Sequence, residues 1–120
     1  MSSAEIYDPT GNGSSNLTTD LSGNSLTYPR YGHTATLVQD SGGSYFVLIM
    51  GGFSFAQAQV PNAELYDPLT HTFSFLVTTS ANIPANFGFL GHTATLLRDG
   101  RVLLVGGILE PHYKRAPFLE

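Results

Sequence analysis

The chain has 120 residues, of which 42% are hydrophobic and only 12% are charged, so it is too apolar for a disordered chain and can bury one modest core. The net charge is −4 and the five basic residues are scattered, so we expect no nucleic-acid partner. Cysteine is absent, which excludes disulfides, thiolate metal sites and a cysteine nucleophile, and nothing in this composition indicates a compartment.

The first predicted element is a short strand over Ala4–Tyr7. It ends at Asp8-Pro9-Thr10-Gly11, where aspartate and proline favour a turn. A second, weak strand is predicted around Asn16–Leu21 and pairs back onto the first, and Ser22–Pro29 is then a connector.

The next two predicted strands form a hairpin. Gly32–Val38 alternates small and β-branched residues, which suits a strand with neighbours on both sides. Asp40–Ser44 makes the turn, and Tyr45–Met50 is an unbroken apolar run, typical of a strand buried on both faces. This longest apolar run is too short to span a bilayer, so no membrane partner is expected. Gly51-Gly52 ends the run and implies a bulge or a close neighbour.

After a connector over 53–62, two shorter strands are predicted over Ala63–Tyr66 and Thr72–Val77. The Asp67-Pro68 turn joins them. The two hairpins together make four antiparallel strands, and no segment of the chain has a helical period.

The last predicted hairpin joins Gly91–Leu96 to Val102–Val105 through Asp99-Gly100, a strong turn signal between apolar runs. Val102–Val105 is again expected to be buried on both faces. Because a sheet that is apolar on both faces cannot stand alone, these sheets must be sandwiched between copies of themselves.

Two motifs recur with one offset. Ala4-Glu5-Ile6-Tyr7-Asp8-Pro9 returns as Ala63-Glu64-Leu65-Tyr66-Asp67-Pro68, and Gly32-His33-Thr34-Ala35-Thr36-Leu37 returns as Gly91-His92-Thr93-Ala94-Thr95-Leu96. Both returns lie 59 residues further on, whereas the glycine pair returns as Gly106-Gly107 after 55 residues. A period of about 50 residues with paired glycines indicates radial or stacked repeats.

These motifs, together with Asp99-Gly100-Arg101-Val102, resemble the kelch repeat of β-propellers. The form is the one shared by bacterial kelch proteins and the central domain of galactose-oxidase-like enzymes. The chain departs from that family in having no tryptophan. Phe73 stands where the family has its large aromatic residue, and the matching position in the first unit holds Ser14.

The resemblance implies an all-β fold of kelch-type propeller blades, each of four antiparallel strands, with about two blades per chain. It divides the chain into a half blade over 1–31, a whole blade over 32–79 and, after a connector, a half blade over 91–110. Propellers close with roughly four to eight blades. We therefore expect a homo-oligomer in which half blades pair between copies, with a six-bladed trimer favoured.

Kelch propellers mostly act as binding platforms, so the resemblance implies a non-catalytic module that recognises a protein or a polysaccharide. The connector between the second and third strands and the connector between blades are expected on one side of the ring. Aromatic residues with an arginine on such loops are typical of binding hot spots. The candidate binding residues are Arg30, Tyr31, Phe53, Phe55, Phe87 and Phe89. The alternative is that these rings pack beneath long loops.

The sequence offers no candidate for catalysis, for a metal ion or for a cofactor. His33 and His92 each stand at the start of a strand, which favours a hydrogen-bonded structural role, and no histidines have metal-ligand spacing. No Gly-x-Ser-x-Gly sequence occurs either. We therefore expect no enzymatic activity.

The main alternative is that the chain is a fragment of a larger kelch propeller without activity of its own. Such a propeller could belong to a copper radical oxidase resembling galactose oxidase. The site of that family needs a tyrosine crosslinked to a cysteine, and cysteine is absent here.

Overall fold

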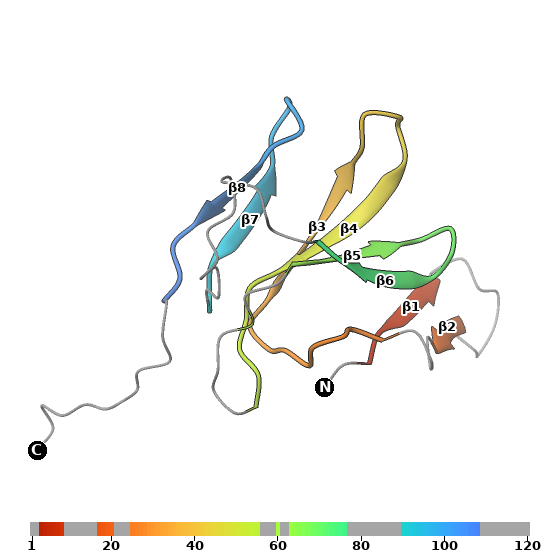
Figure 1. Ribbon diagram of the computed structural model, residues 1–120, viewed down its shortest axis with the longest axis horizontal. Coiled ribbons are helices and arrows are strands. Elements are labelled where there is room, and N and C mark those ends of the chain that lie inside the picture. The colour runs from red at the N-terminus through yellow and green to blue at the C-terminus, as the bar shows by residue number, and fades with distance from the viewer. Residues whose placement is uncertain are drawn as a thin grey trace, which may run out of the picture.

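The computed structural model describes residues 3–8, 17–20, 25–55, 60, 63–76 and 90–108 (Figure 1). Within these ranges the chain forms eight strands and no helix, so the predicted all-β class is confirmed. No helix of the described residues could cross a membrane. The strands are β1 (Glu5–Asp8), β2 (Leu17–Asp20), β3 (Thr34–Gln39), β4 (Tyr45–Met50), β5 (Glu64–Asp67), β6 (Thr72–Phe75), β7 (Thr93–Leu96) and β8 (Val102–Val105).

The eight strands form three separate antiparallel sheets. The central sheet has four strands in the order β3-β4-β5-β6, and it is flanked by the two-stranded sheets β1-β2 and β7-β8. Short turns join β3 to β4, β5 to β6 and β7 to β8. In the β3–β4 turn the Asp40 carboxylate accepts hydrogen bonds from the amides of Gly42 and Ser44 at 2.9 Å each. All predicted hairpins are present, and the outermost central strand ends at Phe75 rather than Val77.

Strand pairing repeats with the sequence. In the central sheet Ala35 lies opposite Ile49, and in the third sheet Ala94 lies opposite Leu104, which are the same positions shifted by 59 and 55. The β1–β2 pairing likewise matches the β5–β6 pairing, from the glutamate at the start of each first strand to the aspartate at its end. Each flanking sheet therefore corresponds to one half of the central sheet. The β1-β2 sheet corresponds to β5-β6, and the β7-β8 sheet corresponds to β3-β4.

The third sheet packs against one face of the central sheet. The Nε2 atom of His92 lies 2.8 Å from Oγ1 of Thr34, and Leu90 packs directly on the backbone of Gly32. We call this side, which carries Thr34, Leu48 and Met50, the covered face. The opposite side is the open face, and the first sheet lies beyond it (Figure 1).

Burial along β3 reflects this one-sided packing. Thr34, Thr36 and Val38 on the covered face are half-buried, whereas Ala35 and Leu37 on the open face are exposed. The prediction that β3 has neighbours on both faces therefore holds for one face within the described part of a single chain.

The expectation that Val102–Val105 is buried on both faces is wrong for the single chain. Val102 and Leu104 are half-buried, but Leu103 is 48% exposed and Val105 is 55% exposed. The cause is that no described element covers their face of the third sheet. Their counterparts in the central sheet, Leu48 and Met50, are half-buried and buried because the third sheet lies over them.

The core gathers where β4 ends, around the glycine pair Gly51-Gly52. Gly52 has a φ of +89°, and a Cβ atom there would lie 2.6 Å from the carbonyl oxygen of Tyr31 and 3.2 Å from the amide nitrogen of His33. Gly52 therefore lets two backbone segments meet, which is the close neighbour that the sequence predicts at the glycine pair. The buried apolar residues are Leu26, Ile49, Met50, Phe53, Val60 and Ala63.

Replacing Gly52 with alanine tests this close approach. Gly100 has the same φ of +89°, but a Cβ atom there meets no neighbour within 4 Å, so Gly100→Ala is a control that carries the backbone strain alone. We expect Gly52→Ala to lower the free energy of unfolding by roughly 3 kcal/mol and Gly100→Ala by about 1 kcal/mol. Urea denaturation measures both, and equal losses would contradict the packing argument.

Candidate functional site

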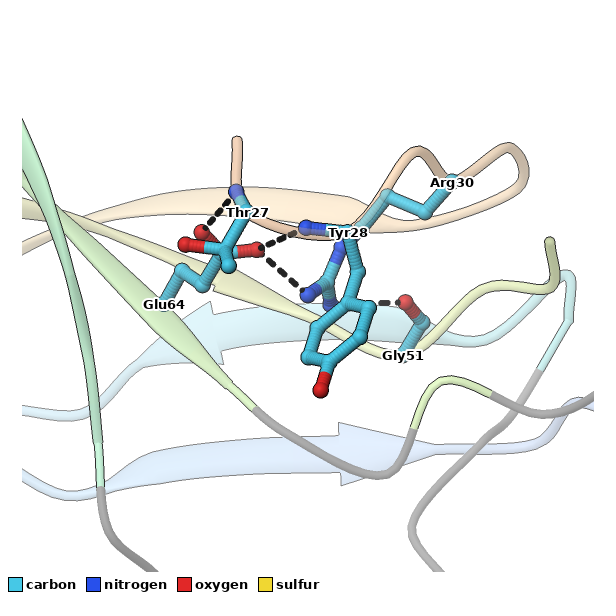
Figure 2. A network of polar contacts seen from close by, with 5 residues as sticks. All are labelled: Thr27, Tyr28, Arg30, Gly51 and Glu64. Atoms are coloured by element: carbon cyan, nitrogen blue, oxygen red, sulfur yellow. Dashed lines mark hydrogen bonds and ion pairs between the residues drawn. The ribbon is translucent and has the colours of Figure 1, made fainter. Parts of the chain in front are cut away.

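A buried ion pair lies at the base of the loops that carry the candidate binding residues. Arg30, just before β3, donates from Nη2 to Oε2 of Glu64 on β5 at 2.7 Å, and both side chains are fully buried (Figure 2). The second terminal nitrogen of Arg30 donates to the carbonyl oxygen of Gly51 at 3.1 Å. Arg30 therefore ties the entry of β3 to the end of β4 and to β5.

The Glu64 carboxylate also holds the connector that precedes Arg30. Its Oε1 atom accepts a hydrogen bond from the Thr27 amide at 2.7 Å, and its Oε2 atom accepts a longer one from the Tyr28 amide at 3.5 Å. Figure 2 shows the carboxylate between these two amides and the guanidinium. One carboxylate thus pairs with a buried cation and accepts hydrogen bonds from two backbone amides, and a buried charge requires such partners.

Burial lowers the pKa of Arg30, and the charge and hydrogen bond of Glu64 oppose that shift. Arginine keeps its proton across the accessible pH range, so Arg30 stays a cation within the pair. Its role is structural, because neither side chain is open to solvent.

An aromatic cluster sits on this base. The segments at Tyr31 and Phe53 form a two-way backbone bridge, each amide donating to the other's carbonyl oxygen at 2.9 and 3.0 Å. The Tyr31 ring centroid lies 6.4 Å from that of Phe53 and 6.2 Å from that of Phe55. Phe53 is fully buried, Tyr31 is 39% exposed and Phe55 is 75% exposed. The cluster therefore runs from the interior to the surface.

The predicted binding residues separate into three groups. Tyr31 and Phe55 are exposed and contact each other, so both can touch a ligand. Arg30 and Phe53 are buried, which corrects their assignment as contact residues: Arg30 is held by Glu64, and Phe53 packs beneath Tyr31. Phe87 and Phe89 lie outside the described residues.

Sequence reasoning missed the role of Glu64. The signal was present, because Glu64 lies in the repeated Ala-Glu-x-Tyr-Asp-Pro motif, and a glutamate inside an apolar strand needs a cation. What the sequence could not indicate was which arginine supplies it, since Arg30 is 34 positions away.

The two motif histidines have different surroundings. His92 is buried and contacts Thr34, which confirms the structural role predicted for it. His33 is exposed on the open face, where partial burial and then the charges of Arg30 and His92 lower its pKa. Among the described residues no group of three histidine or carboxylate side chains could hold a metal ion.

A cleft of about 450 Å³ opens between the open face and the first sheet. Its lining includes His33, Ala35, Val47 and Ile49 from the central sheet and Ile6 from β1. The lining is mainly apolar and spans all four central strands. It is therefore an unfilled packing surface rather than a pocket with converging polar groups.

No protein-family model, no curated protein and no solved structure matches this chain.

Neutralising Glu64 tests the buried pair. Glu64→Gln leaves the Arg30 cation buried without a counter-charge, and we expect the free energy of unfolding to fall by roughly 3–5 kcal/mol. The matched control is Asp99→Asn, because the Asp99–Arg101 pair has a similar length of 2.6 Å but is exposed. We expect little change there, since solvent screens such pairs. Similar effects of both variants on urea denaturation would contradict the account.

Proposed function

We propose that the chain forms blades of a kelch-type β-propeller and acts as a non-catalytic binding module for a protein or a polysaccharide. The propeller is supported by the repeated half-sheet pairing and by the stacking of the third sheet on the central sheet. Radial repetition of four-stranded sheets is the arrangement that buries both faces of each one.

One observation supports the binding function: the aromatic cluster runs from buried Phe53 through Tyr31 to exposed Phe55. Phe55 is 75% exposed, so the hydrophobic effect favours a ligand that covers its ring. The cluster is also rigid at its base, since Phe53 is fully buried and bridged to Tyr31 through the backbone. Rigid aromatic anchors lose little entropy on binding, which is why they are frequent in hot spots.

Arg30 serves this function indirectly. It holds the backbone next to Tyr31 through Gly51 and Glu64, and its own charge is buried. The binding surface on the described residues is therefore aromatic and uncharged, centred on Phe55 and the exposed edge of Tyr31. Such a surface suits a sugar ring or an apolar protein side chain better than an anionic ligand.

Affinity electrophoresis through gels containing galactan, xylan or mannan tests the polysaccharide form. We expect at least one polysaccharide to retard the protein, and Phe55→Ala to weaken that binding by roughly tenfold or more. Tyr45→Ala is the control, because Tyr45 is 55% exposed at the far end of β4. Equal retardation of Phe55→Ala and the unmodified chain would contradict the assignment of the site. If no gel retards the unmodified chain, these polysaccharides are excluded as ligands.

A further inference from the structure

Two strands, β1 and β8, have an edge that no described strand pairs with, although their repeat equivalents in the central sheet are paired on both edges. β5 lies between β4 and β6, but its repeat equivalent β1 pairs only with β2. β4 lies between β3 and β5, but its equivalent β8 pairs only with β7. The edge of β1 therefore lacks a strand of the β4 type, and the edge of β8 lacks a strand of the β5 type.

The two open edges are complementary to each other. The motif at β1 is the motif at β5, and the β7–β8 pairing is the β3–β4 pairing in the same register. Within one chain they lie on opposite sides of the central sheet, with β7-β8 on the covered face and β1 across the cleft from the open face (Figure 1). They can meet only between copies.

We propose that β8 of one copy pairs antiparallel with β1 of a second copy and completes a four-stranded sheet in the order β7-β8-β1-β2. In the central sheet Val47 lies opposite Tyr66, Leu48 opposite Leu65 and Ile49 opposite Glu64. Shifting this register by the repeat offsets places three pairs across the contact: Val102 opposite Tyr7, Leu103 opposite Ile6 and Leu104 opposite Glu5. The inference is independent of what the aromatic cluster binds.

Burial supports the same arrangement. Leu103 and Val105 point away from their own central sheet and are 48% and 55% exposed. In the completed sheet they face the open face of the second copy, where Val47 and Ile49 line the cleft. Their equivalents Leu48 and Met50 are covered by such a sheet, and Met50 is only 4% exposed. The contact thus fills an apolar cleft with two exposed apolar side chains.

A polar contact between sheets is repeated as well. Within one chain His92 of the third sheet meets Thr34 of the central sheet at 2.8 Å. The equivalent pair is His33, which lines the cleft, and Thr93, which is exposed. In the assembly His33 of one copy therefore meets Thr93 of the other.

The first glycines of the two Gly-His-Thr motifs differ in whether a neighbouring sheet covers them. A Cβ atom on Gly32 would collide with Leu90 of the next sheet, whereas one on Gly91 meets nothing within 4 Å. Since Tyr31 is the equivalent of Leu90, the assembly places Tyr31 of the second copy over Gly91 of the first. Part of the Tyr31 ring is then covered, and Phe55 remains the exposed end of the aromatic cluster.

One position weakens the contact. Glu5 occupies the place of Glu64, but position 89, which corresponds to Arg30, is phenylalanine. The completed sheet therefore buries the Glu5 carboxylate without that arginine, which is costly. Glu5→Gln removes the charge and is expected to lower the dissociation constant by roughly tenfold or more.

Because the contact uses a different surface on each copy, it is heterologous and generates a ring when the rotation closes. Each copy supplies one complete sheet, and each contact supplies one composite sheet. Three copies then give a six-sheet ring, which lies within the roughly four to eight blades of closed propellers.

Disulfide trapping between single-cysteine variants resolves the register, because the natural chain has no cysteine. Four variants are made: Ile6→Cys, Tyr7→Cys, Val102→Cys and Leu103→Cys. Residues directly opposite in antiparallel strands lie roughly 4.5–5.5 Å apart at Cα, within the range a disulfide spans. Each first-strand variant is mixed with each β8 variant under oxidising conditions, and linked peptides are identified by mass spectrometry.

We expect Ile6→Cys to link to Leu103→Cys, and Tyr7→Cys to link to Val102→Cys. The crossed mixtures, Ile6→Cys with Val102→Cys and Tyr7→Cys with Leu103→Cys, place the sulfurs on opposite faces and should link at least tenfold less. Each variant thus serves as its own control, and the two Tyr7→Cys mixtures suffice if Ile6→Cys does not fold. Equal linkage in matched and crossed mixtures, or no linkage in any, would overturn the proposal.

Discussion

The buried contact between Arg30 and Glu64 is the interaction on which the described site depends. It joins the connector before β3, the carbonyl at the end of β4 and the start of β5, three segments that are distant in the sequence. Because both charges are fully buried, the pair tolerates only one geometry. That geometry sets Tyr31 beside Phe53 and so directs the aromatic cluster toward the surface.

A second constraint is that β4 and β8 carry apolar side chains on both faces of their sheets. The third sheet covers one face of the central sheet, and the result is visible in the burial of Met50. Where no described sheet follows, as at Leu103 and Val105, apolar side chains remain exposed. The repeat therefore indicates which contacts are made within the described part of one chain and which contacts the proposed assembly adds.

Much of the strand layout could be predicted from the sequence, because alternation, turn residues and repeated motifs are local signals. The Asp-Gly hairpin before Arg101 and the apolar run of β4 are examples. The site was harder to predict from the sequence. Arg30 looks like an interface arginine, because the sequence does not show that Glu64 lies beside it. Phe53 and Phe55 look equivalent in sequence, although Phe53 is buried and Phe55 is exposed. Long-range pairing and loop burial depend on tertiary contacts that local patterns do not encode.

The central claim is that half-sheets of this chain complete one another between copies. Light scattering of the intact chain during size-exclusion chromatography tests it most directly, because the mass counts the copies. The account predicts a species of about three times the 12.9 kDa chain mass, with the six-sheet ring as its structure. A folded species of 12.9 kDa that persists at every concentration would contradict it.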